Sequence, residues 1–449
     1  KAAFDPERLL NPGVLLNDDP KIHVKNLKVM PLADEIVDLC IECGFCEPAC
    51  PSHHMTLTPR QRIAVTRERA RLKQTGEDPA RLARFEADFQ YAGMDTCAAC
   101  NLCSLRCPVG IETGTMILGE RARRRGDTAR SVAHFVADHR GAVESMMRGG
   151  VAVADMARKV VPAPAVEAIT DTARRLTGRH VPRVSRALHH GPGTPKAKDN
   201  RQDPRKSGFP VPIAQTGRPS VVYFPACPSR MFGAPETHHQ LLPTNQAMVT
   251  LLERAGFDVI IPEHLNGQCC GQPFQSKGFP QEAEKVGGML MAQLNDLSVD
   301  GALPVVTDAS TCAKHLQAVP GSAEVSDSAQ FLVEQVLPNL SITQKLKIVA
   351  VHHNCSAQRL GEQPATEAIA RACAEEIAVL TSVTCCGYAG DKGLFLPELN
   401  QHATRRVRDD IPPGCELGVS TVSTCASGLT ERADLPFVGL ASLLEWASR

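Results

Sequence analysis

The chain has 449 residues, enough for about three domains of ordinary size. Lys and Arg together number 49, as do Asp and Glu, so no net charge draws the chain to nucleic acid or to an anionic membrane. Aromatic residues make up 4%, with Trp446 the single Trp, which excludes the stacking platform of single-strand nucleic-acid binders. We therefore expect no nucleic-acid partner.

The 18 cysteines are unevenly distributed, and residues 1–39 and 108–226 contain none. Small disulfide scaffolds spread cysteine throughout, whereas grouped cysteines are typical of metal ligands in a reducing compartment. No signal peptide opens the chain, and no apolar run approaches the ~18 residues of a membrane span. We expect a cytoplasmic protein, either soluble or peripheral on the inner face of the membrane.

The first residues do not read as the beginning of a domain, and residue 1 is Lys rather than Met. Residues 4–13, FDPERLLNPG, resemble the closing segment of the C-terminal domain of FAD-linked oxidases. The resemblance implies that residues 1–30 are the tail end of such a domain, with FAD bound in a part upstream of this chain. We expect the chain to be a fragment or a processed half.

Two cysteine runs share the spacing C-x2-C-x2-C-x3-C-P: CIECGFCEPACP at 40–51 and CAACNLCSLRCP at 97–108. This is the two-cluster ferredoxin spacing, in which three cysteines hold one [4Fe-4S] cubane and the fourth serves the other. The first cubane set is Cys40, Cys43, Cys46 and Cys107. The second cubane set is Cys97, Cys100, Cys103 and Cys50.

A pair of zinc knuckles is the alternative, but zinc has no use for a third evenly spaced cysteine and a proline, repeated twice. Between the runs, Thr58-Pro59 with Gln61 predicts a capped helix that starts at Pro59, and Asp78-Pro79 predicts a second. These signals predict an α-helical ferredoxin domain over 31–125.

Residues 126–219 form a predicted connector with little chemistry. From Glu112 to about Leu188 the pattern is helical, with a break at 162–164, and 191–219 is a linker rich in Gly, Pro and Lys. Beyond it, short β-branched runs alternate with helical stretches, which predicts α/β layers. The predicted strands are 221–224, 257–261, 303–307, 348–352 and 378–383.

The second half contains an internal repeat, so we divide it into copy 1 (220–340) and copy 2 (341–449). Each copy has a cysteine after a strand, a Cys-Cys-Gly, a later Lys and a Ser-Thr-Cys-Ala. The repeated order predicts a metal site at strand ends, with Gly permitting a tight turn and Ser-Thr capping a helix. The candidate ligands are Cys227, Cys269, Cys270 and Cys312 in copy 1, and Cys355, Cys385, Cys386 and Cys425 in copy 2.

Residues 221–449 resemble the duplicated cysteine-rich CCG domain of heterodisulfide reductase B subunits, glycolate oxidase iron-sulfur subunits, the C subunit of anaerobic glycerol-3-phosphate dehydrogenase, and long FAD-linked D-lactate and D-2-hydroxyglutarate dehydrogenases. The stretches CCGQPFQSKGF and CCGYAGDKGLFLPEL are most similar to the last group. The resemblance implies the iron-sulfur half of a D-lactate dehydrogenase-like enzyme.

One feature departs from the heterodisulfide reductase pattern, in which each motif ends in CxxC. Ala309 and Val422 stand three residues before Cys312 and Cys425, so each copy offers four thiolates. A noncubane cluster, a cubane, a zinc ion, an empty site and buried structural cysteines all remain open.

Several other residues receive weaker predictions. We expect Cys373 and Cys415 to be buried structural residues, His352-His353 to be satisfied at a strand end rather than ligating, and His53-His54 to lie in a surface loop. Lys277 and Lys392 are expected to be exposed, with an offset of cluster charge as the alternative.

The sequence has no GxGxxG motif after a predicted strand, so it gives no sign of a nicotinamide- or flavin-binding site. It also shows no recognisable combination of nucleophile, general base and oxyanion-stabilising groups. We therefore expect electron transfer from FAD in a dehydrogenase domain or subunit to a quinone, a cytochrome or an electron-transfer flavoprotein. The alternatives are a heterodisulfide-reductase-like catalytic subunit and a zinc-stapled structural module.

Overall fold

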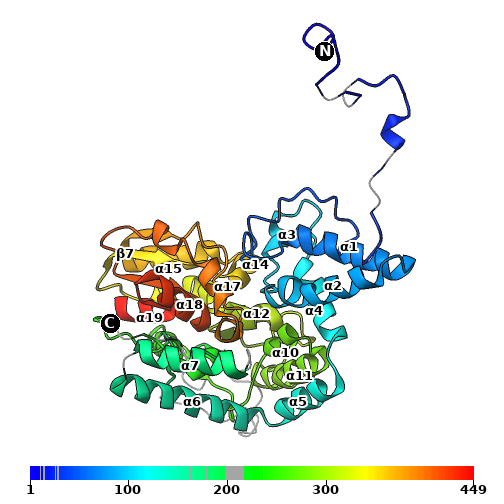
Figure 1. Cartoon of the computed structure of the whole chain (residues 1–449). Coiled ribbons are helices and arrows are strands. Elements are labelled where there is room, and N and C mark those ends of the chain that lie inside the picture. The colour runs from blue at the N-terminus through cyan, green and yellow to red at the C-terminus, as the bar shows by residue number, and fades with distance from the viewer. Residues whose placement is uncertain are drawn as a thin grey trace.

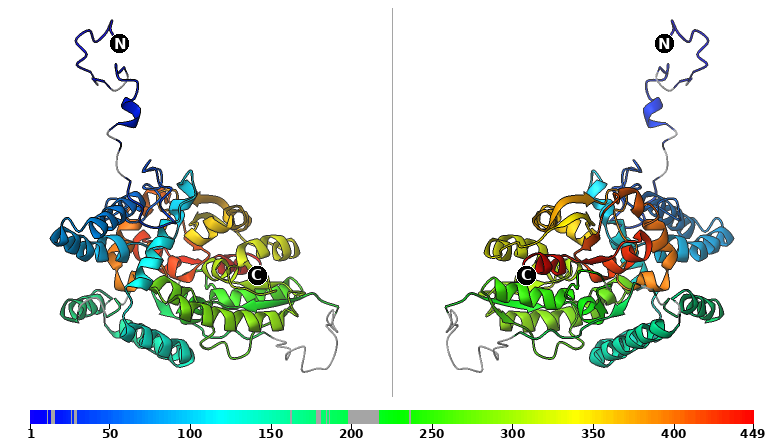
Figure 2. Two further views of the ribbon diagram at one scale, coloured as in Figure 1. Left: turned by 90° about the vertical axis from the view of Figure 1, so that its right-hand side faces the viewer. Right: turned by 90° about the vertical axis from the view of Figure 1, so that its left-hand side faces the viewer.

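The structure is a computed model that describes the chain except for residues 11, 14–15, 26, 28–29, 162, 178–180, 184, 186, 198–216 and 236. Figure 1 shows a helical domain on one side, two α/β units beside and below it, and a row of helices along the lower edge. The N-terminal residues extend away from this body (Figure 2) and contain the short helix η1 (Ile22–Val24). Asn11, in the stretch that resembles a flavoprotein end, lies outside the described residues.

The helical domain begins as its capping residues predict. Helix α1 (Pro59–Thr75) has Thr58 as N-cap, and Gln61 completes the reciprocal capping box. Helix α2 (Pro79–Phe89) is capped by Asp78. The remaining helices of this domain are η2 (Gln90–Asp95), α3 (Leu102–Arg106) and α4 (Thr113–Arg123).

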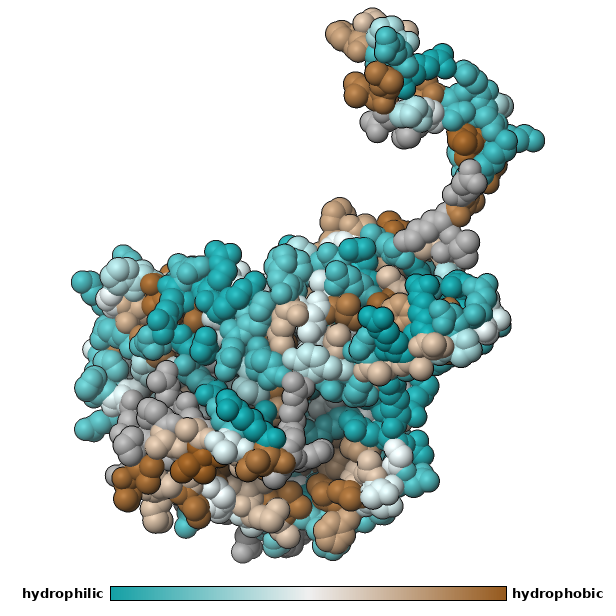
Figure 3. Space-filling model, viewed as in Figure 1, coloured by the Kyte–Doolittle hydropathy of each residue, from teal (hydrophilic) through white to brown (hydrophobic). Residues whose placement is uncertain are grey.

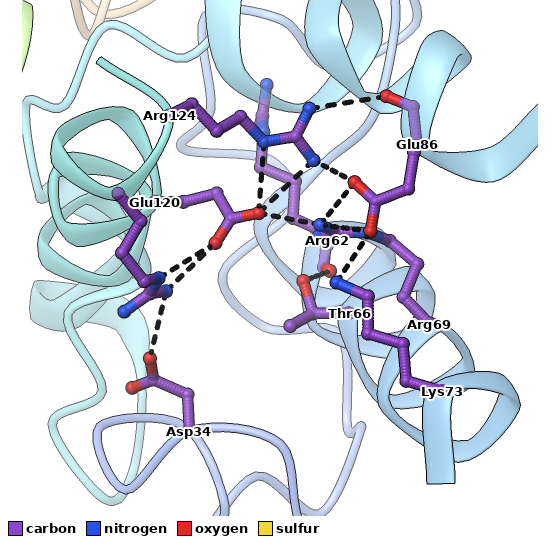
Figure 4. A network of polar contacts seen from close by, with 9 residues as sticks. Asp34, Arg62, Thr66, Arg69, Lys73, Glu86, Glu120 and Arg124 are labelled. Carbon is purple, nitrogen blue, oxygen red and sulfur yellow. Dashed lines mark hydrogen bonds and ion pairs between the residues drawn. The ribbon is translucent and has the colours of Figure 1, made fainter. Parts of the chain in front are cut away.

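A small apolar core and an ionic network hold these helices together. The core includes Val37, Ile63, Phe89, Met94 and Ile117. Figure 4 shows the network, in which carboxylates from α2 and α4 meet arginines from α1 and α4. Arg69, on α1, donates to Glu86 at 2.8 Å and to Glu120 at 2.6 Å. Because both carboxylates share one buried guanidinium, α2 and α4 are fixed on the same face of α1.

The predicted connector is helical up to residue 177. It consists of α5 (Asp127–Asp138), α6 (Arg140–Val160) and α7 (Ala163–Thr177). Residue 162 of the predicted break and residues 198–216 of the predicted linker lie outside the described residues. Helices α6 and α7 run along the lower edge of the molecule in Figure 1.

The second half contains two four-stranded parallel sheets with the same strand order. The orders are β4-β2-β5-β6 in copy 1 and, read from the matching edge, β8-β7-β9-β10 in copy 2. The strands are β2 (Ser220–Phe224), β4 (Asp258–Ile260), β5 (Val305–Thr307), β6 (Val325–Asp327), β7 (Leu346–Val351), β8 (Ala374–Val379), β9 (Leu417–Ser420) and β10 (Phe437–Gly439). The predicted α/β repeat is therefore present as two equivalent sheets.

All five predicted strands occur, although β8 ends four residues before the predicted run does. The strands β6, β9 and β10 were not predicted, because they are three or four residues long and, unlike the equally short β5, contain Ser, Asp or Gly among their residues. A further pair, β1 (His189–His190) and β3 (Phe232–Gly233), is antiparallel.

Helices cover both sheets and form one continuous core with them. In copy 1 they are α8 (Cys227–Met231), α9 (Thr244–Arg254), α10 (Gln272–Lys277), α11 (Pro280–Leu297), α12 (Ser310–Leu316), α13 (Ser328–Phe331), η4 (Leu332–Val336) and η5 (Leu337–Asn339). In copy 2 they are α14 (Cys355–Leu360), α15 (Gln363–Cys373), α16 (Lys392–Phe395), α17 (Pro397–Ala403), η6 (Val407–Asp410), α18 (Ser423–Ala433) and α19 (Leu440–Ala447). No helix in the described part of the chain is long and apolar enough to span a membrane.

Candidate metal centres

The first cubane set surrounds a cavity in the helical domain. Its four cysteines line the cavity together with Ile41, Ile63, Val109 and Ile111. Cys107 comes from the second run, yet it lies with the three leading cysteines of the first. The structure thus brings together the four cysteines of the first cubane set, in which three come from the first run and the fourth comes from the second run.

The second cubane set lies in the same domain and is more deeply buried. Cys50 lies near Cys97 and Cys100, and all three lie near Cys103. Burial raises the pKa of Cys103 to about 12, and the neighbouring thiols add to the shift. Cationic metal is the usual way to stabilise such thiolates.

The two cysteine loops have matching backbone conformations. Glu42 and Ala99 both have positive φ values, 58° and 50°, and so do Gly44 at 86° and Asn101 at 54°. The Glu42 amide donates to Cys40 Sγ, and the Ala99 amide donates to Cys97 Sγ, both at 3.4 Å. Left-handed non-glycine residues cost free energy. Here the turn directs amide donors at sulfur, which favours a negatively charged cluster.

Arg62 is a buried cation beside the second cubane set that sequence reasoning missed. Its Nη1 donates to Cys50 Sγ at 3.6 Å, and its Nε donates to the Gly93 carbonyl at 2.7 Å. The sequence of α1 could have indicated this buried cation, because some of the helix positions that face the core are occupied by arginines instead of apolar residues.

The copy 1 cysteines gather at the carboxyl ends of three neighbouring strands, where open α/β sheets place their sites. Cys227 begins α8 after β2, and Cys312 lies in α12 after β5. Cys270 Sγ lies 3.4 Å from Cys312 Sγ, and the free thiols of Cys269 and Cys227 are in hydrogen-bond contact. Gly271 has φ 98°, and a Cβ there would lie 2.4 Å from the Ala283 carbonyl oxygen, so the predicted glycine turn is required.

The copy 2 cysteines have the same arrangement. Cys386 Sγ lies 3.1 Å from Cys425 Sγ, and the free thiols of Cys385 and Cys355 are in hydrogen-bond contact. The Gly387 amide donates to Cys385 Sγ at 3.4 Å, as Gly271 does to Cys269 at 3.5 Å.

The predicted capping by the Ser-Thr pairs is wrong. Ser310 and Ser423 are the first helical residues, and the caps are Ala309 and Val422, which carry no capping side chain. Ser310 Oγ instead donates across to Asn354 Oδ1 at 3.0 Å, and Asn354 caps α14. These contacts tie the two copies together next to their cysteines.

Copy 2, but not copy 1, touches the second cubane set within the described residues. The thiols of Cys100 and Cys385 are in hydrogen-bond contact, and both pack with Ala49 and Leu102. Lys392 Nζ donates to the Cys97 carbonyl at 3.0 Å. Four-cysteine sets from two domains therefore lie side by side.

The two lysines differ from the expectation of exposed side chains. Lys392 is half-buried, and the loss of solvent around its ammonium lowers its pKa to about 7. Lys277, partly exposed, forms an ion pair with Asp391 of copy 2 at 2.5 Å. Lys392 therefore lies next to a cysteine set, whereas Lys277 joins the two copies.

The remaining cysteines and histidines meet expectation only in part. Cys373 is fully buried, whereas Cys415 is half-buried. His352 is buried and its Nδ1 lies 3.3 Å from Ser420 Oγ, but its Nε2 has no partner in the described residues. His54 is exposed, and the His53 carbonyl accepts from His402 of copy 2 at 2.6 Å, so this loop is part of an interface.

The donors present fit iron-sulfur clusters. Each set offers thiols, amide donors to sulfur and an apolar surround, which are the features that clusters require. Among the described residues, no group of three or more His, Cys, Asp or Glu has the arrangement of a single-ion site. The fit to clusters therefore depends on the cysteine grouping itself.

Comparisons with known proteins identify both cysteine-rich regions. Residues 36–111 match the 4Fe-4S dicluster domain, and residues 221–317 and 349–430 match the cysteine-rich domain CCG. The chain is 26% identical over 298 residues to the probable glycolate oxidase iron-sulfur subunit of Bacillus subtilis, an alignment that covers 62% of this chain and 57% of that protein. It is 25% identical over 442 residues to the glycolate oxidase iron-sulfur subunit of Escherichia coli, covering 92% of this chain and 93% of that protein. These matches confirm the predicted resemblance: the chain joins a 4Fe-4S dicluster domain to a duplicated CCG domain, as the iron-sulfur half of an FAD-linked 2-hydroxyacid dehydrogenase does.

Proposed function

We propose that this chain is the iron-sulfur electron-transfer part of an FAD-dependent D-2-hydroxyacid dehydrogenase whose substrate is D-lactate, D-2-hydroxyglutarate or glycolate. FAD and the substrate site belong to a partner domain or subunit, and the acceptor is a quinone, a cytochrome or an electron-transfer flavoprotein. The names of both relatives support this oxidoreductase class and do not favour a heterodisulfide-reductase-like subunit.

The observation that carries the proposal is the series formed by three cysteine sets: the first cubane set, the second cubane set and the set of copy 2. Cys40 and Cys107 of the first cubane set pack against the same core as Cys97 of the second. Cys100 of the second set then contacts Cys385 of copy 2. A protein that bound zinc only to stabilise its fold would not need cysteine sets that lie next to one another in space.

The chain's own residues hold and tune these centres. All sixteen candidate cysteines are proposed ligands, with [4Fe-4S] clusters in the two cubane sets and further iron-sulfur clusters or zinc in the copies. Clusters held there supply one-electron transfer. Arg62 and the amides of Glu42 and Ala99 stabilise negative charge on sulfur.

Metal analysis and substrate reduction of the holoenzyme test the proposal. About eight irons per chain correspond to two cubanes, and about twelve to sixteen mean that the copies also hold clusters. Adding the 2-hydroxy acid without oxygen should bleach the cluster absorbance of the holoenzyme. A colourless protein, or clusters that no 2-hydroxy acid reduces, would contradict the proposal.

Cys43→Ser sharpens this test. We expect it to lower the iron content by about four and to block acceptor reduction, while substrate still reduces the flavin. Cys415→Ser, a cysteine outside every set, is the matched control and should behave as wild type. Normal acceptor turnover in Cys43→Ser would remove the first cubane set from the electron path.

A further inference from the structure

The first cubane set stands at one end of the series of cysteine sets, and solvent reaches it. Cys43 is exposed, whereas Cys97 and Cys103 of the second set are buried. Copy 2 closes the other side of the second set through the Cys100 and Cys385 contact. Cys43 is the one exposed thiol among the candidate ligands in the part of the chain that the structure describes, so an electron donor can approach this set most closely there.

The surface around Cys43 is unusually apolar. Side chains from both cysteine runs meet at this cavity, because Ile41 and Val109 line it together. Six large apolar residues that each lie within four positions of a ligand of the first cubane set are 41–72% exposed. They are Ile36, Leu39, Ile41, Phe45, Leu105 and Val109. We call these six residues the entry face, since single exposed apolar residues are common but several beside one ligand set indicate an interaction site.

The charged residues within the first loop are neutralised internally. Glu42 pairs with Arg67 at 3.2 Å, and Glu47 pairs with Arg60 at 2.6 Å. These carboxylates therefore add little net charge to the entry face. Figure 3 shows hydrophobic side chains on the body near the point where the N-terminal segment joins it.

We propose that the entry face docks the flavin-bearing domain or subunit, and that this contact sets the distance between flavin and the first cubane set. The inference rests on the proposed function. The occupant is a redox protein rather than a lipid surface, because Cys43, a proposed cluster ligand, lines the same cavity as Ile41 and Val109. The basic side chain that lines this cavity, Arg60, is already paired with Glu47 and is not free to bind lipid headgroups. Exposed aromatic and aliphatic side chains are the usual anchors of such a contact.

A second apolar face provides the matched control. Helix α6 exposes Met146, Val153, Met156 and Val160, and Figure 3 shows this hydrophobic strip along the lower edge. It lies on the connector, whose Glu144 binds Arg230 of copy 1, and Figure 1 shows α6 at the lower edge, apart from the helical domain that contains both cubane sets. The two faces thus have similar composition but different distances from the cubane sets.

Hydrogen exchange of the holoenzyme against the chain alone is the primary test. We expect protection of amides at 36–48 and 105–110 in the holoenzyme and none on α6. Protection on α6 alone, or on neither face, would overturn the proposal. This measurement needs no variant and reports on contact rather than on turnover.

Paired variants give the second readout. Leu39→Ser with Phe45→Ser should weaken binding of the chain to its flavoprotein by about tenfold or more, because truncating central apolar anchors has that effect. Met146→Ser with Val153→Ser should leave binding unchanged. Iron content and cluster spectra of both variants should match wild type, and unchanged binding in the first variant would overturn the proposal.

The outcomes separate the two proposals. If wild-type clusters are never reduced by substrate in the holoenzyme, the proposed function fails and the docking inference fails with it. If they are reduced while the entry face is neither protected nor needed for binding, only the docking inference fails.

Discussion

Copy 1 and copy 2 share a sheet order and four cysteines each, yet their surroundings differ. Copy 2 packs against the second cubane set, with Cys385 touching Cys100. Copy 1 packs against the connector, where Arg230 forms a buried ion pair with Glu144. The same cysteine pattern therefore lies inside the proposed electron path in copy 2 and at the edge of that path in copy 1. The pattern alone does not determine the role of a site.

Equivalent positions in the two copies also carry different polar groups. In copy 1 the last paired residues of β5 and the edge strand β6 are Thr307 and Asp327. The equivalent residues of β9 and the edge strand β10 in copy 2 are Ser420 and Gly439. A buried acid therefore ends the edge strand of copy 1 where copy 2 has glycine. Three residues before the first cysteine, Phe224 of copy 1 corresponds to His352 of copy 2, both fully buried.

The largest expected difference between the copies is in their anchoring arginines. Arg230 is 1% exposed and binds Glu144 through two bonds, of 3.0 and 2.8 Å, so Arg230→Leu should cost about 3–5 kcal/mol by leaving Glu144 buried and unpaired. Arg359 pairs with Glu112 at a partly exposed site, so Arg359→Leu should cost about 1 kcal/mol or less.

Urea unfolding of both variants measures this difference. A double variant that removes Glu144 as well, by Glu144→Leu, should recover part of the loss, because the unpaired charge is then gone. Equal losses in the two single variants would show that the copies are anchored alike.

A second comparison concerns electron flow. Cys385→Ser should lower acceptor reduction by roughly 100-fold, because it alters the contact with the second cubane set. Cys269→Ser, the equivalent change in copy 1, should have the smaller effect. Acceptor turnover and iron content of each variant are measured together, and a larger loss in Cys269→Ser would place copy 1 in the main path.

The smallest expected effect comes from the buried acid of copy 1. Burial, with Glu362 nearby, raises the pKa of Asp327 from 3.8 to about 7. Between these values the folded carboxyl holds a proton that the unfolded chain lacks, so stability is highest at low pH and falls as the pH rises toward 7. From pH 5.5 to 7.5 this group should remove about 2 kcal/mol of stability.

Asp327→Asn should abolish that decline. Asn keeps an oxygen that can cap α13, and it carries no charge to bury. Unfolding free energies of wild type and variant, measured between pH 5.5 and 8.5, should diverge as the pH rises. Parallel profiles would mean that Asp327 is already ionised in the folded protein at pH 5.5.

The sequence predicted features that depend on local rules. The capped start of α1 at Pro59, the crossing of Cys107 to the first run and the glycine turn at Gly271 follow from spacing, capping and backbone freedom. Features that depend on distant contacts were not predictable. The bonds of Ser310 to Asn354 and of Lys392 to Cys97 arise only once the copies and the helical domain pack together.

The enclosure of the second cubane set has a consequence for biogenesis. Its neighbours Cys385 and Lys392 lie almost 300 positions after Cys97 and Cys100, so they leave the ribosome long after the helical domain has emerged. Until then the second set is open on the side that copy 2 later covers. All four cysteines of the second cubane set are therefore synthesised well before the segment that encloses them, so this enclosure is completed only by the last quarter of the chain.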